Sequence, residues 1–228
     1  MASNVSFGTM VSSVLMRANM ENSLFITAAE VREYLNYALA DLYDLLVKAR
    51  AQEFYRSTFT INTVNGTATY ALPTDFYELT SVDITLGSNI VLTARPYMEA
   101  ERNRFRWYPG WFYNQPVYYR LQGNSIGFIP VPSGAFTVTL NYYPTFTKFA
   151  TNGTQDASTF DGVNGWEEYA VWKAAADCIA KEENDPAYAL GKVAELRARI
   201  EGLAALRDAG NAERVHDVTG DMTPWSGY

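Results

Sequence analysis

The hydrophobic pattern of this 228-residue chain changes its period twice, and these two changes constrain the fold most strongly. Apolar residues recur every three or four positions up to about Tyr55. They alternate with polar residues from Ser57 to about Tyr142, and helical spacing returns at Trp166. A period near 3.6 predicts amphipathic helices, and a period of two predicts half-buried strands. The order of helices, antiparallel strands and helices therefore predicts an α+β fold.

Two helices are predicted before the first change of period. The longer covers residues 27–55, where Thr27 and Glu30 form a capping box and the apolar residues Phe25 and Ile26 precede it as a hydrophobic staple. A shorter helix is predicted over residues 9–18. The apolar faces of the two helices are formed by Val31, Leu35, Leu39, Leu42 and Leu46, with Tyr34, Tyr37 and Tyr43 beside them, and by Met10, Val14 and Leu15.

Two further helices are predicted after the second change, over residues 166–184 and 186–209. Pro186 separates them, because proline is tolerated in the first turn of a helix and penalised inside one, and Gly210 stops the second helix. The apolar faces are Tyr169, Trp172, Ala176 and Ile179, then Leu190, Val193, Leu196, Ile200 and Leu203. We expect this antiparallel hairpin to close on the N-terminal helices as a helical bundle.

The β region is expected as an antiparallel sheet or sandwich inserted into that bundle. Phe59 and Ile61 alternate with threonines, and Asn65 and Gly66 favour a type I′ turn, which predicts a hairpin ending near residue 72. Pro73 cannot donate to a β-ladder and should end the returning strand. Further strands are predicted at residues 79–86, 90–94, 117–121, 125–129 and 136–142.

The predicted organisation has four parts. Residues 1–56 hold the N-terminal helices, and residues 57–150 hold the β region. Residues 151–210 hold a linker and the helical hairpin, and residues 211–228 form an extended C-terminal tail without periodicity. The linker itself is expected over residues 145–165, which are rich in Thr, Gly, Asn and Asp.

The composition favours a protein that acts through contact surfaces. The chain has 16 tyrosines and only 19% charged residues, and tyrosine suits surfaces that are wet before assembly and dry after it. Its net charge of −7 argues against a protein that grips nucleic acid through phosphate neutralisation. The chain has a single cysteine, Cys178, which excludes an internal disulfide. No secretory signal and no apolar run of about 18 residues is visible, so a soluble chain is expected.

The basic and aromatic residues gather between residues 95 and 116. Residues 96–105 are predicted as a short helix with Pro96 in its first turn, followed by a structured loop. Single-stranded nucleic acid would fit such a cluster through stacking and phosphate pairing, and a protein interface uses the same residue types. In an acidic chain we favour the protein interface, with carbohydrate as a third alternative. The interface candidates here are Arg102, Arg104, Arg106, Trp107 and Trp111.

No constellation for catalysis, metal or cofactor is predicted. His216 is the only histidine and lies in the tail, and Cys178 is expected to be a buried small side chain. Glu167 and Glu168 suit the first turn of a helix, where negative charge complements the helix dipole. The acidic corner at residues 182–185 lacks the ligand spacing of a calcium loop. We therefore expect no enzyme activity, no cofactor and no metal site.

The order of these segments resembles that of head–tail connector proteins of tailed bacteriophages, the tail-tubular-protein-A-like adaptor group that forms a ring beneath the portal. Four features carry the resemblance, and no single one is specific. They are the helix over residues 27–55, the sequence YALPTDF at residues 70–76, which is similar to the group's Y-x-L-P-x-D-F strand exit, the strand signals at residues 123–132 and 138–143, and the closing helical pair around residues 182–188.

The resemblance implies a structural virion protein at the head–tail interface. It implies a homo-oligomeric ring, commonly of twelve copies, that joins the portal to a tail, stopper or nozzle protein and lets DNA pass through its lumen. It also implies that the tail is an interaction arm. The interface candidates in this arm are Arg214, His216, Met222, Trp225 and Tyr228.

Two alternatives stay open. One is another tail structural protein, such as a stopper, nozzle or baseplate component. The other is a glycan-binding or hydrolytic tail protein, which for hydrolysis needs two acids about 5 to 10 Å apart, and no spacing in the sequence indicates such a pair.

Overall fold

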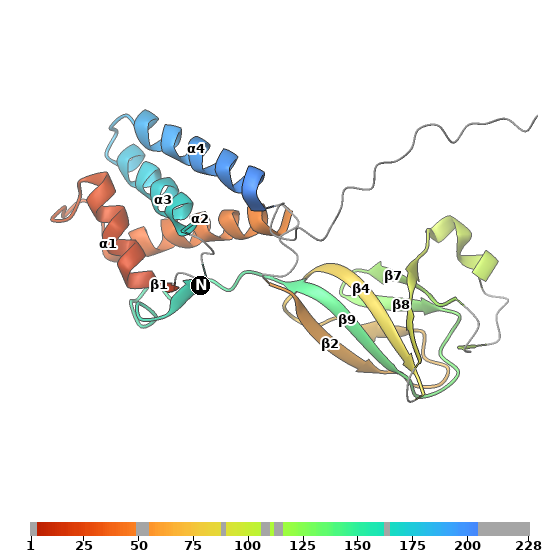
Figure 1. Cartoon of the computed structure of the whole chain (residues 1–228). Helices are drawn as coiled ribbons and strands as arrows, with labels where there is room; N and C mark the ends of the chain where they lie inside the picture. The colour runs from red at the N-terminus through yellow and green to blue at the C-terminus, as the bar shows by residue number, and fades with distance from the viewer. Residues whose placement is uncertain are drawn as a thin grey trace, which may run out of the picture.

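The computed structural model shows an elongated molecule with helices at one end and β-sheets at the other (Figure 1). It describes residues 4–48, 55–87, 90–105, 110–111, 116–161 and 165–204. The helices among these residues are α1 (Phe7–Ala18), α2 (Ala28–Lys48), α3 (Glu167–Lys181) and α4 (Ala187–Ala204). The strands lie mostly between α2 and α3 in the sequence, so the predicted α+β class is confirmed.

The two N-terminal helices begin at the caps that the sequence indicates. The backbone N–H of Thr27 donates to the Glu30 carboxylate at 2.9 Å, and the Glu30 N–H donates to the Thr27 hydroxyl at 3.3 Å. This reciprocal pair is the predicted capping box. Helix α1 begins two residues earlier than predicted, because the Ser6 hydroxyl accepts a hydrogen bond from the Thr9 N–H at 3.2 Å. Of the two staple candidates, Ile26 is buried and Phe25 is exposed.

One hydrophobic core joins all four helices. Val14 of α1, Leu39 of α2, Ala174 of α3 and Ile200 of α4 are each at most 1% exposed in it. The predicted apolar face of α4 is buried only in part, since Leu190 and Leu203 are about half exposed. Helix α4 packs against α3 and more sparsely against α2, so part of its apolar face stays uncovered.

The segment between the β region and α3 is packed structure, which the linker prediction missed. Strand β10 (Thr159–Asp161) pairs with β1 (Asn4–Ser6), and Phe149 packs into the helical core, where its ring stacks on that of Phe7. Asp156 forms an ion pair with Arg32 of α2 at 2.6 Å. Polar residues dominate this segment, but its aromatic side chains and Asp156 fasten it to the helices.

Two facing four-stranded sheets form a β-sandwich. One has the order β2 (Ser57–Asn62), β9 (Thr137–Pro144), β4 (Phe76–Leu86), β5 (Ile90–Thr93). The other has the order β3 (Thr69–Ala71), β8 (Ser125–Ile129), β7 (Tyr118–Gln122), β6 (Arg95–Pro96). Side chains from both inner faces, including Ile84, Leu140, Ile126 and Phe128, form a second core.

The predicted hairpin of β2 and β3 is wrong, because these strands belong to different sheets. β2 pairs with β9 and β3 pairs with β8. Gly66 has a φ of +81°, whereas Asn65 is not at positive φ, so the turn is not of type I′. The Tyr70 hydroxyl instead organises the crossing, since it accepts from the Val64 N–H at 2.8 Å and donates to the Thr67 carbonyl at 2.9 Å.

The short helix predicted over residues 96–105 is shorter than expected and not an α-helix. Arg95–Pro96 forms the parallel strand β6, and a 3₁₀ helix, η1 (Glu99–Phe105), follows it. The Arg95 N–H donates to the Val117 carbonyl at 2.9 Å. This ladder contact holds Pro96 in an extended conformation, so the helix starts later.

Candidate interaction surface

An open groove lies between the two sheets along one side of the sandwich, and we call it the edge groove. It encloses about 430 Å³. The residues that line it are Phe76, Tyr77, Glu78 and Leu79 of β4, Pro96 and Tyr97 at β6, and Tyr119, Arg120 and Leu121 of β7. Most of these side chains are apolar or aromatic, which is typical of a surface that binds another apolar surface.

The edge groove exists because one strand crosses between the sheets. β5 pairs with β4 only over Asp83–Leu86. The Ala94 N–H then donates to the Val82 carbonyl at 2.8 Å, and the chain continues as β6 in the other sheet. Within the described residues, positions 76–81 of β4 therefore have β9 on one side and no paired strand on the other.

The aromatic stretch at residues 70–79 both fastens this edge and lines the groove. Phe76 stacks on Tyr142 of β9 with ring centroids 5.8 Å apart. The Tyr142 hydroxyl donates to the Asp75 carboxylate at 2.9 Å, and the Thr145 N–H donates to the Asp75 carbonyl at 2.6 Å. These contacts fix the start of β4, so that Tyr77 and Leu79 line the groove in a defined position.

The walls of the edge groove carry little net charge. Burial raises the pKa of Tyr119, and burial together with the nearby Glu99 carboxylate raises the pKa of Tyr97. Both phenols are therefore neutral at physiological pH. The Arg120 guanidinium forms an ion pair with Glu99 at 2.9 Å. Such walls suit binding of an apolar segment, and they bring together no nucleophile and base.

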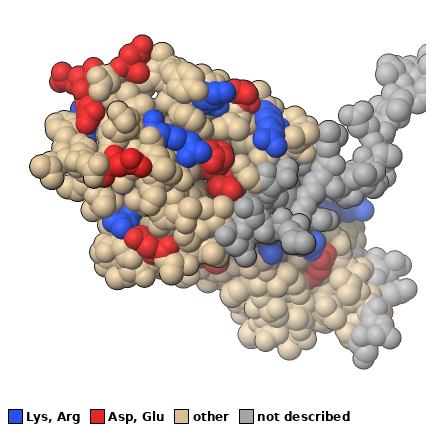
Figure 2. Space-filling view, turned by 60° about the vertical axis from the view of Figure 1, so that its left-hand side comes forward, with Lys and Arg blue, Asp and Glu red and all other residues tan. Residues whose placement is uncertain are grey.

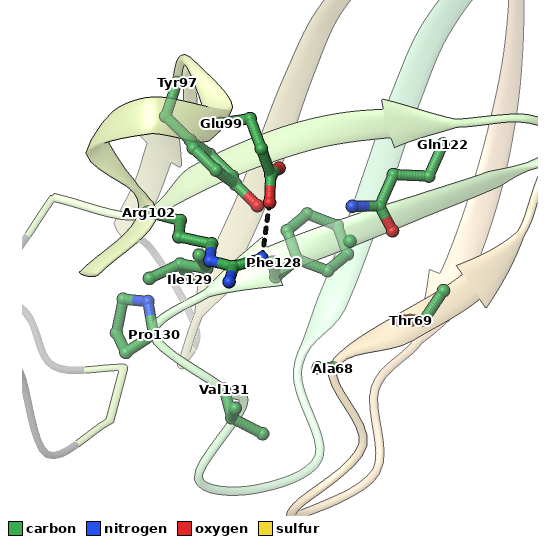
Figure 3. A pocket seen from close by; sticks show the side chains of 11 residues that line it. Ala68, Thr69, Tyr97, Glu99, Arg102, Gln122, Phe128, Ile129, Pro130 and Val131 are labelled. Atoms are coloured by element: carbon green, nitrogen blue, oxygen red, sulfur yellow. Dashed lines mark hydrogen bonds and ion pairs between the residues drawn. The ribbon is translucent and has the colours of Figure 1, made fainter. Parts of the chain in front are cut away.

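A second, more polar hollow of about 510 Å³ lies between η1 and the outer face of the β3–β8–β7–β6 sheet (Figure 3). Tyr97, Glu99 and Arg102 line one side, and Ile129, Pro130 and Val131 lie across from Arg102. Glu99 binds the guanidinium groups of both Arg102, at 2.8 Å, and Arg120. One carboxylate therefore compensates the charge of both cations in part.

The upper end of the edge groove adjoins the helices. The Tyr77 hydroxyl donates to Asp44 of α2 at 3.1 Å. Tyr43 and Val47 of α2 pack against Tyr143 of β9 in a small buried cluster. Burial, followed by the neighbouring Tyr77 and Asp44, raises the pKa of Tyr43 to about 12. This contact sets the position of the groove relative to the helical part.

Trp111 is the one interface candidate that the structure contradicts. Its side chain is 2% exposed in the sandwich core. The indole Nε1 donates to the Pro130 carbonyl at 2.7 Å, and the ring stacks on Phe136 at 5.4 Å. A core site that supplies both an apolar pocket and an acceptor satisfies the whole indole, so Trp111 is not available as a surface anchor.

Of the other candidates, Arg102 is exposed on η1 and paired with Glu99. Arg104 also lies in η1, but its side chain is outside the described residues. Seven further candidates lie outside them entirely: Arg106, Trp107, Arg214, His216, Met222, Trp225 and Tyr228. Sequence reasoning did not single out Tyr119 and Leu121, because the sequence of β7 resembles that of an ordinary buried strand.

A second exposed apolar feature lies at the other end of the molecule. In the loop between α1 and α2, Leu24 is fully exposed and Phe25 is 56% exposed. The Lys181 ammonium lies 5.3 Å from the Phe25 ring centroid and pairs with Glu30 at 2.6 Å. These contacts of Lys181 hold the loop in place, so that it exposes its apolar side chains in a defined position.

Charges elsewhere are mixed. Figure 2 shows positive and negative side chains interspersed over the helical part of this face, with no large area of one sign.

Cys178 is buried as predicted, and burial raises its pKa to about 12, which makes it a poor nucleophile. Glu167 and Glu168 lie in the first turn of α3, also as predicted.

The described residues contain no group of three His, Cys, Asp or Glu side chains placed to hold a metal ion. No helix among them combines the length and the apolar character needed to cross a bilayer.

A family model described as SU10 adaptor protein matches residues 5–221 of the chain. The match covers both the helical part and the sandwich. No curated protein matches the chain.

Proposed function

The chain belongs to the SU10 adaptor protein family, and we propose that it forms an oligomeric ring that joins the portal to the tail. The family indicates a phage structural adaptor protein, a virion component of the head–tail junction. The ring, its copy number of twelve, the portal contact and the passage of DNA through the lumen are our proposal.

The observation that carries this proposal is the edge groove beside the unpaired side of β4. A closed ring needs heterologous contacts, in which one surface of a subunit binds a different surface of the next. The edge groove offers one apolar surface, and the Leu24–Phe25 loop offers another at the opposite end of the molecule. Two separate apolar surfaces on one chain support head-to-tail assembly.

We propose that the helices act as a rigid bundle in this assembly. They share one core, and ion pairs tie them together at Arg17–Glu168 and Lys173–Asp41, both at 2.5 Å. Residues 211–228 would serve as an interaction arm toward the portal or tail. A bundle that keeps its shape would hold the groove and the loop at fixed relative positions, as ring closure requires.

We propose that the protein has no catalytic activity. The two hollows contain carboxylates, but Glu99 is occupied by two guanidinium groups and Glu78 lies on the exposed rim of the groove. The net charge of −7 suits a conduit that DNA crosses without binding. DNA would be passing cargo.

The mass of the purified chain, measured alone and with portal protein, tests the proposal. We expect a ring or a portal-bound complex. Leu121→Asp in the edge groove should abolish it, because a buried charge at an interface is costly. Leu190→Asp is the matched control, since Leu190 is 52% exposed near the start of α4 and does not line the groove. A monomer that ignores the portal would contradict the proposal, and selective binding to a tail-tip protein would favour a stopper, nozzle or baseplate role.

A further inference from the structure

The free subunit has an exposed strand edge beside an apolar gap. Positions 76–81 of β4 lack a second paired strand within the described chain, and Tyr77 and Leu121 at the groove are 47% and 38% exposed. An open edge next to apolar surface is a template for unwanted pairing, and natural proteins usually cover such edges. A subunit that has not yet assembled therefore needs a segment that covers this groove.

The described chain stops on the side of the helical part that faces the sandwich. Helix α4 runs back along α3, and its end at Ala204 points toward the sandwich (Figure 1). Burial raises the pKa of Asp41 on α2, but the hydrogen bond from Lys173 and, more weakly, the charge of Arg197 on α4 lower it, so that the pKa is lowered overall. One turn further along α2, Asp44 accepts the hydrogen bond from Tyr77 at the groove.

The 24 residues that follow Ala204 in the sequence have the composition of a spacer with an anchor. Residues 205–221 are mostly polar or charged, and the large apolar side chains that follow are Met222, Trp225 and Tyr228. At about 3.3 Å per residue, the spacer reaches on the order of 55 Å when extended. A chain of that reach can return from the end of α4 to the sandwich, toward which this end points.

We propose that residues 222–228 dock into the edge groove of their own subunit, with the Trp225 indole as the main anchor. A groove of about 430 Å³ with walls of Leu79, Tyr119 and Leu121 accommodates an indole. The Arg120 guanidinium on the same wall can stack on the ring. The segment covers the strand edge of the free subunit until a partner displaces it. This inference does not depend on a ring.

Cysteine cross-linking in the full-length chain tests the proposal. Glu78→Cys places a thiol on the exposed rim of the groove, and Ser226→Cys places one beside Trp225. Val91→Cys with Ser226→Cys is the matched control, because Val91 is 61% exposed on β5 outside the groove. Cys178 is buried and does not compete. Oxidised glutathione is added to dilute protein, and the intact mass of each species is followed in time.

We expect the 78–226 pair to form an intramolecular disulfide at least about tenfold faster than the 91–226 pair, because docking raises the local concentration of the thiols. Adding Trp225→Ala and Tyr228→Ala should lower the rate to that of the control. Equal rates for the two pairs would overturn the proposal. Predominance of disulfide-linked dimers would also overturn it, because the segment would then occupy the groove of a second copy.

Discussion

The phenol of Tyr43 on α2 donates a hydrogen bond to the carbonyl oxygen of Pro144 at the end of β9. This bond joins the helical part to the sandwich at the point where the chain passes between them. The Tyr43 ring also packs on Tyr55 at 4.6 Å and lies 6.1 Å from Phe146. The Tyr43 side chain thus contacts both the segment that leads into the sandwich, at Tyr55, and the segment that leaves it, at Pro144 and Phe146.

We expect Tyr43→Ala to lower the free energy of unfolding by about 3–5 kcal/mol, since it removes a buried aromatic ring. Tyr43→Phe should cost about 1 kcal/mol, the contribution of one hydrogen bond. Urea denaturation measures both values. Tyr37→Phe is the control, because Tyr37 is 52% exposed and should change stability by less than about 0.5 kcal/mol. Equal losses in Tyr43→Phe and Tyr37→Phe would contradict the role of the Pro144 contact.

The capping box of α2 predicts a pH dependence of stability. The hydrogen bond from Lys181 and those from Thr27 lower the pKa of Glu30 from 4.5 to about 2. A carboxylate with a depressed folded-state pKa stabilises the fold above its unfolded pKa, and this contribution disappears as the pH falls. Stability should therefore decrease between about pH 4.5 and pH 2, as followed by urea denaturation at a series of pH values.

Two variants separate the partners of Glu30. Glu30→Gln should remove this part of the pH dependence. Lys181→Met should remove most of it, because the Lys181 hydrogen bond is the largest cause of the shift. An unchanged pH profile in Glu30→Gln would show that other groups dominate acid unfolding.

The sequence predicted well where the helices start because these signals are local, although Tyr55, at the predicted end of the helix over residues 27–55, is not helical. The Thr27–Glu30 box and the spacing of residues such as Leu35 and Leu39 lie within one segment, and no distant partner is needed to read them. Strand positions were also predicted closely, and β8 matches its predicted range. The pairing of β2 was not predicted, because β2 ends at Asn62 and its partner β9 begins 75 residues further along the sequence.

The edge groove could not be predicted from the sequence for the same reason. It arises where the chain crosses from β5 to β6 near Ala94, so that Leu79 and Leu121 line the same open groove. Alternation along β7 predicts that Leu121 faces inward, but it does not show that β4 lacks a paired strand beside Leu79 in the facing sheet. Trp111 shows the opposite error, since an aromatic in an arginine-rich loop was expected at the surface and lies in the core.

Helix α4 offers a test of the shared helical core. Ile200 is 1% exposed, and Ile200→Ala should lower the free energy of unfolding by about 2–5 kcal/mol. Leu203→Ala lies one turn away at 46% exposure and should cost less than about 1 kcal/mol. Chemical denaturation of both variants compares them directly. A similar cost at both positions would mean that α4 is not packed as described.

Two glycines should respond to alanine in opposite directions. Gly153 has a φ of +84°, and an added Cβ would lie 3.2 Å from an Arg32 nitrogen in the Arg32–Asp156 pair. Gly153→Ala should therefore destabilise the protein by more than about 1 kcal/mol. Gly191 lies in α4 with open space around it, and Gly191→Ala should stabilise the protein by about 0.5–1 kcal/mol. Thermal unfolding of the two variants should shift the midpoint in opposite directions, and a shared direction would contradict the assignment of both sites.

Deletion of residues 211–228 should leave the subunit folded and impair its docking. Among the described residues, the helical core extends to Ile200 and the sandwich core lies between Ile61 and Leu140, so both cores are built from residues that precede this segment. We expect cooperative thermal melting to persist, while portal binding is lost and light scattering increases because the edge groove is uncovered. The full-length variant with Trp225→Ala and Tyr228→Ala should reproduce both effects, which separates the loss of the anchor from the loss of chain length. If the truncated protein no longer melts cooperatively, the segment contributes to the fold itself, and its role as an arm would have to be abandoned.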